Sequence, residues 1–303
     1  MSKSSIVFFG TGQTSLEALI ELEKNFIIEA VVTKPAPRTS NGSSRPTEVE
    51  RWAKTMGLKV FNPAGKQDLT ELIRSQKFSS SVGVVLDYSL IIPKDVIESF
   101  SLGILNSHFS LLPRYRGADP IRSTILNGDD ETGVTIIKIV SDLDAGPILS
   151  WAEYSLKNEI TAPELRSELS ELNARLLNET LKLYLAGDVD PIAQDDSRAT
   201  YTTKTSKQDG LIDSTKPAKQ IEREVRAFKI WPKSYFYFND LLIFVSKATV
   251  SDKKFPTGEL SIDEKNLYYG TASGSLQLEI LQLSGKAEMT AANFINGYKK
   301  MIV

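Results

Sequence analysis

Short apolar runs alternate with amphipathic segments through the first half of the chain. Runs typical of buried strands occur at 6–9, 28–32, 58–61, 82–86, 104–106 and 133–139. Helical patterns occur between several of them, at 14–23, 47–57 and 93–100. Because strands separated by helices pair in parallel, this pattern predicts an α/β fold, with a doubly wound, mostly parallel sheet and helices on both of its faces.

The pattern changes in the second half of the chain. A long amphipathic helix opens near Thr161 and ends near Gly187, and the following residues are polar and rich in turn formers. Short strands then dominate up to a closing helix at 291–300, a pattern typical of a small β-barrel. We therefore predict a first domain at 1–187, a linker at 188–203, and a smaller barrel domain at 204–303.

Composition narrows the class of protein. Hydrophobic residues make up 41% of the chain and charged residues 24%, as in globular proteins. No apolar run is long enough to span a bilayer, and the first run, near Ile6, is too short for a signal peptide. The chain has no cysteine and one histidine, which excludes disulfides, thiolate metal sites and histidine-rich metal sites. We expect a cytoplasmic, metal-free protein with no membrane partner.

Charge is spread unevenly along the chain. The formal net charge is −2, but residues 198–303 carry 16 Lys and Arg against 11 Asp and Glu, a charge of +5. Residues 1–197 therefore carry −7. A basic C-terminal third favours a polyanionic partner on that side, although a solvated basic face would explain the charge alone equally well.

A glycine-containing turn after the first strand partly matches a dinucleotide-binding motif. Gly10 and Gly12 fit its beginning, but Ser15 stands where the motif needs a third glycine. The second strand runs into Thr33 and Lys34, with no acidic residue to hold a ribose hydroxyl. The glycines are therefore better explained by a tight turn between strand and helix than by a nicotinamide site.

The only histidine, His108, lies two residues after Asn106 at the end of a predicted strand. Both side chains should point to one face, at the carboxyl edge where α/β sheets hold ligands. The predicted strand at 133–139 leads into the segment 142–149, which contains Asp144. An amide, an imidazole and a carboxylate can polarise a carbonyl and move a proton near neutral pH. The alternative is that His108 packs with a satisfied hydrogen bond and Asp144 caps a turn.

A wider motif surrounds these three residues. From Asn106 to Gly146 the chain reads N-x-H-x-S-L-L-P-x-Y-R-G-x-x-P, then N-G-D-x-x-T-G-V-T, then D-x-G. This resembles the 10-formyltetrahydrofolate-dependent formyltransferases, which have a Rossmann-like sheet. Segments 9–11 and 88–93 resemble the same family. Segments 204–213 and 226–232 resemble the start of the OB-like C-terminal domain found in members that act on methionyl-tRNA, so the resemblance covers most of the chain.

The resemblance implies transfer of a formyl group from 10-formyltetrahydrofolate to an amine. By resemblance, Asn106 and His108 donate hydrogen bonds to the oxyanion of the tetrahedral intermediate, and Asp144 positions the imidazole and helps move the proton. No metal is required. The residues implied to bind the folate are Leu86, Tyr88, Leu90, Ser110, Leu111, Leu112 and Pro113. Asp87 and Ser89 depart from the small residues usual there.

The acceptor implied is the α-amino group of initiator methionyl-tRNA, bound by a monomer for translation initiation. The expected tRNA-binding residues are Lys34, Arg38, Arg45, Lys204, Lys207, Arg226, Lys229 and Lys233. Formyl transfer to a nucleotide-linked amino sugar and hydrolysis of formyltetrahydrofolate remain open. Glycinamide ribonucleotide transformylases resemble the first domain only, and a non-catalytic tRNA- or folate-binding module would not need the intact Asn106, His108 and Asp144.

Overall fold

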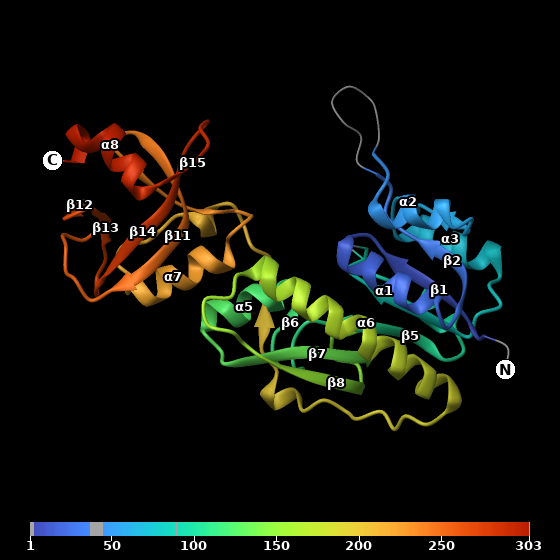
Figure 1. Ribbon diagram of the computed structural model, residues 1–303. Helices are drawn as coiled ribbons and strands as arrows, with labels where there is room; N and C mark the ends of the chain where they lie inside the picture. The colour runs from blue at the N-terminus through green and yellow to red at the C-terminus, as the bar shows by residue number, and fades with distance from the viewer. Residues whose placement is uncertain (1–2, 37–44, 89, 303) are drawn as a thin grey trace. The chain divides into compact units, whose positions relative to one another are not determined.

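A computed structural model describes residues 3–36, 45–88 and 90–302 (Figure 1). The chain forms two compact units that are interleaved along the sequence. The first consists of Met1–Gly117, Glu131–Ser155 and Arg166–Thr202. The second consists of Ala118–Asp130, Leu156–Leu165 and Thr203–Val303.

A seven-stranded sheet forms the centre of the first unit, in the order β3-β2-β1-β4-β5-β7-β8. Its strands are β1 (Ser5–Gly10), β2 (Ile27–Val32), β3 (Val60–Phe61), β4 (Val82–Leu86), β5 (Gly103–His108), β7 (Glu131–Lys138) and β8 (Ile148–Ser155). β3, β2, β1, β4 and β5 are parallel, whereas β7 and β8 pair antiparallel. The predicted mostly parallel α/β sheet is therefore confirmed.

Helices bury their apolar positions against this sheet. They are α1 (Gln13–Glu23), α2 (Glu48–Thr55), α3 (Lys66–Gln76), α4 (Lys94–Glu98) and α6 (Ala162–Ala186). On one side Leu69 and Ile73 of α3 and Val96 of α4 join the core around Phe9 and Ile104. Every 100 Å² of apolar surface buried in this way contributes about 2.5 kcal/mol relative to exposure.

The turn between β1 and α1 is tight, as the glycines predict. A Cβ atom on Gly10 would lie 2.7 Å from the Cβ of Ser15. The Ser15 hydroxyl accepts from the Thr11 amide and donates to the carbonyl oxygen of Leu86 over 2.6 Å. Ser15 therefore ties the turn to the end of β4, and its small side chain is what the turn needs at that position.

The segment after α6 returns to the first unit and is anchored there. Ile192 exchanges two backbone hydrogen bonds with Ile148, both of 2.8 Å. Further on, β9 (Tyr201–Thr202) pairs in parallel with β6 (Arg116–Gly117). In Figure 1 this segment, in yellow, runs back from the end of α6 along β8. Two parts of this segment, Ile192 and residues 200–202, are therefore hydrogen-bonded to the first unit.

An antiparallel sheet and three helices form the second unit. The strands pair in the order β10-β11-β14-β13-β12, with β15 beside β14. Their bounds are Ser234–Phe238 (β10), Leu241–Ser251 (β11), Leu260–Asp263 (β12), Asn266–Gly270 (β13), Ser275–Leu283 (β14) and Glu288–Thr290 (β15). The helices are α5 (Pro120–Asn127), α7 (Ala218–Ala227) and α8 (Ala291–Ile302). An antiparallel C-terminal domain of this kind is consistent with the predicted small barrel.

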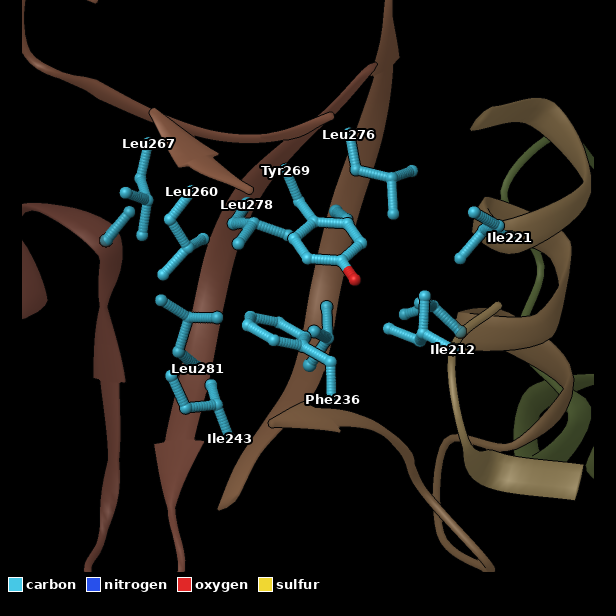
Figure 2. Packing of buried hydrophobic residues seen from close by; sticks show 14 of the residues in the cluster. Ile212, Ile221, Phe236, Ile243, Leu260, Leu267, Tyr269, Leu276, Leu278 and Leu281 are labelled. Atoms are coloured by element: carbon cyan, nitrogen blue, oxygen red, sulfur yellow. The ribbon is translucent and has the colours of Figure 1, made fainter. Parts of the chain in front are cut away.

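One hydrophobic core holds the second unit together (Figure 2). The rings of Phe236 and Tyr269 stack with their centroids 4.5 Å apart. Ile221 of α7 faces the strands in the same cluster, while Leu267 and Leu281 extend the core along the sheet (Figure 2). Because α7 and the sheet bury their apolar faces on each other, this domain has a core of its own.

Several regular elements are absent from the predicted set, among them the short strands β6, β9 and β15 and two longer elements of the first unit. The helix α3 was not expected, because its charged sequence KQDLTELIRSQ offers only three apolar positions. The edge strand β8 was also not expected, and in the structure only one of its residues is fully buried. In the part of the chain that the structure describes, no helix is both long and apolar enough to cross a membrane.

Candidate active site

The strand β5 places Asn106 and His108 at the carboxyl edge of the sheet. Asn106 lies opposite Val85 of β4 on one side and Ile137 of β7 on the other. His108 lies two residues further, opposite Thr135, and only 6% of it is exposed. Because alternate residues of a strand share a face, the amide and the imidazole project to the same side.

The loop between β7 and β8 brings Asp144 to these two residues. The Asn106 amide nitrogen Nδ2 lies 3.5 Å from Asp144 Oδ1. The His108 ring nitrogen Nδ1 lies 3.6 Å from Asp144 Oδ2, which is ion-pair distance and longer than a direct hydrogen bond. The structure therefore brings together the three side chains that the sequence analysis singled out, and the two oxygens of one carboxylate face the two partners.

A glycine allows this loop to fold back on β7. A Cβ atom on Gly146 would lie 1.7 Å from the backbone carbonyl oxygen of Lys138. The close approach of two backbone segments therefore requires glycine at this position. Gly146 is the last residue of the D-x-G motif, so the motif places the carboxylate and the close approach in one short loop.

Backbone groups of residues 115 and 117 form hydrogen bonds with His108 and Asp144. His108 Nε2 lies 2.8 Å from the backbone carbonyl oxygen of Tyr115. A carbonyl only accepts, so Nε2 carries a proton in this arrangement. On the other side, the backbone amide of Gly117 donates to Asp144 Oδ2 over 2.8 Å. Sequence reasoning missed these two backbone groups, because backbone partners leave no trace in side-chain identity.

The imidazole and the carboxylate lie side by side at the edge of the sheet. With Nε2 donating to Tyr115, the Nδ1 atom of His108 faces Asp144. An imidazole beside a carboxylate is an arrangement suited to general acid–base catalysis.

A cavity of about 240 Å³ opens beside the carboxylate. Asn106 and Asp144 lie in its wall, whereas His108 is buried and is not among the lining residues. The other lining residues are Val85, Tyr88, Leu90, Ile91, Ile92, Ile137, Ile139, Val140, Ser141, Asp142, Leu143 and Gly146. Apolar side chains line most of this wall, and Asn106, Ser141, Asp142 and Asp144 add polar groups that a ligand there would meet.

Tyr88 lines this cavity and carries a buried polar group next to it. Its hydroxyl is buried and has no hydrogen-bond partner among the described residues. Burial raises the pKa of Tyr88 to about 12, so the phenol stays neutral at physiological pH. An unpartnered buried hydroxyl costs about 1–3 kcal/mol, a cost that a hydrogen bond from a ligand would offset.

The predicted folate residues divide between two cavities. Tyr88 and Leu90 line the cavity beside Asp144. Leu111 and Leu112 line another cavity, of about 250 Å³, together with Thr135, Ile148, Trp151, Glu153 and Ile192.

The remaining three predicted folate residues line neither of these cavities. Leu86 is buried in β4, and its carbonyl oxygen accepts the hydrogen bond from Ser15. Ser110 is fully buried and donates to the Arg114 carbonyl oxygen. Pro113 follows a cis peptide bond and lies with Ser110 in the loop after His108.

The predicted tRNA-binding residues differ in their exposure and in whether protein groups already bind them. Lys34 and Arg45 are exposed in the first unit, and Arg38 lies outside the described residues. Lys204 and Lys207 are exposed in the second unit.

Three other basic residues of the second unit are held by protein groups. Arg226 donates to Glu222 and to the Ile160 carbonyl oxygen. Lys229 donates to the carbonyl oxygen of Ser246, and Lys233 to Gln282. A phosphate would have to compete with these contacts.

Comparison with known proteins agrees with this geometry. The formyl transferase family matches residues 3–181, and the formyl transferase C-terminal domain matches residues 204–299. The chain therefore belongs to the formyltransferase family. It is 37% identical, over 98% of its length and 96% of the relative's, to a protein of Coxiella burnetii (strain RSA 331 / Henzerling II) named methionyl-tRNA formyltransferase.

Solved structures share the fold. An N-formyltransferase from Helicobacter canadensis, crystallised with folinic acid and dTDP-3-aminofucose, matches with a TM-score of 0.70 at 18% identity. The match covers 91% of this chain and 99% of that one. A variant of HypX from Aquifex aeolicus matches with a TM-score of 0.68 at 16% identity, and the chain spans 49% of the length of HypX.

Proposed function

We propose that this chain transfers the formyl group of 10-formyltetrahydrofolate to the α-amino group of initiator methionyl-tRNA. The observation that carries the proposal is the meeting of Asn106, His108 and Asp144 beside a cavity at the carboxyl edge of the sheet. Family membership supports the formyl chemistry. The relatives' name, attached to proteins similar over nearly the whole chain, supports the acceptor.

The reaction exchanges one carbon–nitrogen bond for another. The neutral α-amine attacks the formyl carbon, and the carbonyl oxygen becomes an oxyanion in the tetrahedral intermediate. The bond from carbon to N10 of the folate then breaks, while one proton leaves the attacking nitrogen and one reaches N10. An α-amino group has a pKa near 8, so a useful fraction of the amine is neutral at pH 7.

Asn106 is the donor that best fits the oxyanion in this proposal. Its amide lies in the wall of the cavity, where a formyl oxygen could reach it. The loss of one such donor costs about 3 kcal/mol, or two to three orders of magnitude in rate. Both ring nitrogens of His108 face protein oxygens. Its proposed role is therefore to share a proton with Asp144, and that pair takes the proton from the amine.

The cavity beside Asp144 is the proposed place of the folate ring system. A volume of about 240 Å³ lies below the usual range for whole drug-sized ligands, so it suits one ring system rather than the complete folate. Leu90 and Ile92 supply apolar contacts, and the Tyr88 hydroxyl offers a hydrogen bond to a ring heteroatom. This arrangement would direct N10 and its formyl group toward Asn106 and Asp144.

The test is a competition between acceptors. Purified protein is given 10-formyltetrahydrofolate and methionyl-tRNA, a dTDP-linked amino sugar, or buffer alone, in the presence of EDTA. We expect formylmethionyl-tRNA to form at a rate that exceeds sugar formylation and hydrolysis by at least about a hundredfold, as differences of several kcal/mol in transition-state binding allow. If the sugar were formylated faster than methionyl-tRNA, or if 10-formyltetrahydrofolate were hydrolysed faster than either acceptor is formylated, that reaction would be the function in place of the proposed one.

A further inference from the structure

Gln194, in the segment between the two domain-family matches, contacts the loop that carries Asp144. Its amide nitrogen Nε2 donates to the carbonyl oxygen of Asp144 over 2.8 Å and to that of Gly146 over 2.7 Å. Its oxygen Oε1 accepts from Arg116, at 3.1 Å from Nε and 2.8 Å from Nη2. One side chain therefore joins the catalytic loop to residue 116.

Arg116, which donates hydrogen bonds to Gln194, is buried. Only 2% of the residue is exposed, and its guanidinium also donates to Asp196 and Tyr201. Burial alone would lower the pKa of Arg116, but the hydrogen bonds to Asp196 and Tyr201 outweigh it and raise the pKa. The guanidinium is therefore a fixed cation, and its position is set by several partners at once.

Arg116 lies between the two backbone groups that hold the proposed catalytic pair. Its neighbour Tyr115 accepts from His108, and its other neighbour Gly117 donates to Asp144. Gln194 therefore touches both sides of the site. It holds the Asp144 loop through two carbonyl oxygens, and it holds segment 115–117 through the Arg116 side chain.

The segment around Gln194 is itself attached to the first unit at two places. Before it, Ile192 pairs with Ile148 at the start of β8. After it, the carbonyl oxygen of Thr200 accepts from the Arg116 amide over 2.8 Å. Residues 182–203 lie outside both family matches, so neither match assigns a function to this segment.

We propose that Gln194 is a positioning residue for formyl transfer, which fixes the Asp144 loop relative to His108. The inference rests on the proposed function for its kinetic consequence. It predicts that Gln194 sets kcat through the relative placement of carboxylate and imidazole, and that it contributes little to substrate binding. A residue misplaced by about 1 Å can cost roughly a hundredfold in rate.

An amide is required because this position needs a donor and an acceptor at once. Arg116 only donates, and the carbonyl oxygens of Asp144 and Gly146 only accept. Glutamate at 194 would keep both contacts to Arg116 and place a carboxylate oxygen against the two carbonyl oxygens. The substitution Gln194→Glu therefore breaks only the contacts to the catalytic loop.

The experiment compares Gln194→Glu with the neighbouring substitution Asp195→Ala. Asp195 caps the short helix that follows it, through hydrogen bonds with Ser197, and it contacts neither Arg116 nor the Asp144 loop in the described contacts. For each protein, kcat and KM for formyl transfer and the thermal midpoint are measured. We expect Gln194→Glu to lower kcat about 10- to 100-fold with both KM values within about twofold, and Asp195→Ala to leave kcat within about twofold.

A second measurement does not depend on the enzymatic activity. His108 is the only histidine in the chain, so its ring resonances need no assignment in a spectrum of the histidine-labelled protein with a histidine-free affinity tag. We expect these resonances to shift in Gln194→Glu and to stay in place in Asp195→Ala. Unchanged resonances together with near-normal kcat in a folded Gln194→Glu protein would overturn the inference. Shifted resonances in a protein whose wild type formylates no acceptor would overturn the proposed function and leave the positioning role standing.

Discussion

The ring of His108 donates from Nε2 to the backbone carbonyl oxygen of Tyr115, seven residues further along the chain, over 2.8 Å. This hydrogen bond fixes the plane of the imidazole, and it leaves Nδ1 to face Asp144. The position of the proton on the ring is therefore set by a backbone group that any residue at 115 could supply. The direction of the ring depends on the shape of the loop after Pro113, and less on side-chain chemistry.

The substitutions His108→Ala and Asp144→Asn should both abolish most formyl transfer. The first removes the imidazole, and the second leaves an amide that cannot take up the proton. We expect kcat to fall by about two to four orders of magnitude in each protein, the usual contribution of a general acid–base group. His108→Ala should also lower the free energy of unfolding by about 1–3 kcal/mol, because the Tyr115 carbonyl oxygen loses its partner.

The measurements for this prediction are single-turnover formylation and urea unfolding. The change in kcat must exceed the change that partial unfolding could cause, so both variants are assayed well below their thermal midpoints. Either variant with kcat within threefold of wild type would remove the proton-transfer role proposed for the pair.

Gly146→Ala should disturb the site through the backbone. The added Cβ would lie 1.7 Å from the Lys138 carbonyl oxygen, and a backbone atom cannot move away cheaply. We expect the loop that carries Asp144 to shift, with kcat at least tenfold lower and a reduced thermal midpoint. Gly297→Ala in α8, where nothing lies within 4 Å of the added atom, serves as the matched control.

The control should behave in the opposite way. Alanine in a helix interior is more favourable than glycine by roughly 0.5–1 kcal/mol, so Gly297→Ala should raise the thermal midpoint slightly and leave kcat unchanged. Equal effects of the two substitutions would show that the close approach at Gly146 does not matter for transfer.

The double substitution Lys204→Ala, Lys207→Ala should weaken tRNA binding in a salt-dependent way. Both side chains are exposed, so each can displace a counterion from a phosphate. We expect the slope of log Kd against log salt to decrease by about one unit per lysine. Filter binding or fluorescence anisotropy of methionyl-tRNA between low and physiological salt measures the slope.

Arg226→Ala provides the contrast to the lysine pair. Its guanidinium is engaged by Glu222 and the Ile160 carbonyl oxygen. We expect a lower thermal midpoint and a nearly unchanged salt slope. A slope that decreases more in Arg226→Ala than in the lysine variant would assign the phosphate contact to the arginine.

Glu29→Gln should reduce stability at neutral pH and have little effect in acid. Burial alone would raise the pKa of Glu29, but hydrogen bonds from the side chains and backbone amides of Ser80 and Ser79 outweigh burial and lower it below 4.5. A lowered pKa stabilises the fold above the unfolded value near 4.5, and this contribution is lost as the pH falls through the folded value.

The measurement is the difference in unfolding free energy between wild type and Glu29→Gln at pH 7 and at pH 3. We expect Glu29→Gln to have a lower free energy of unfolding than wild type at pH 7, and we expect this difference to be smaller at pH 3. Glu171→Gln, on the exposed side of α6, should show no difference at either pH. A difference for Glu29→Gln that grows in acid would contradict the sign of the pKa shift.

The residues of the site could be predicted because they follow from strand geometry and a dense local motif. Asn106 and His108 share a face because they are two residues apart on β5. Asp144 lies in a loop whose position depends on the antiparallel pairing of β7, which the apolar run at 133–139 does not reveal. The motif, and not the periodicity, placed Asp144 with the other two.

Gln194 and the backbone groups at 115 and 117 were not predicted. A glutamine in a polar, turn-rich segment has the appearance of a solvated linker residue, and its partners are carbonyl oxygens and an arginine distant in sequence. The folate residues were predicted as one group, yet only Tyr88 and Leu90 share a cavity with Asp144. Neighbours in sequence point to different sides of a strand or loop, and alternation alone does not show which side holds a ligand.

The attachment of residues 192–202 to the first unit bears on where the catalytic half of the chain ends. A fragment cut at Gly187, where α6 stops, would lack Gln194 and the strand that pairs with Arg116. Such a fragment would keep the side chains of Asn106, His108 and Asp144. It would lose the hydrogen bonds that Gln194 and β9 make to the segments beside them. The part of the chain that supports the site should therefore extend at least to Thr202, and removal of residues 188–202 should lower kcat.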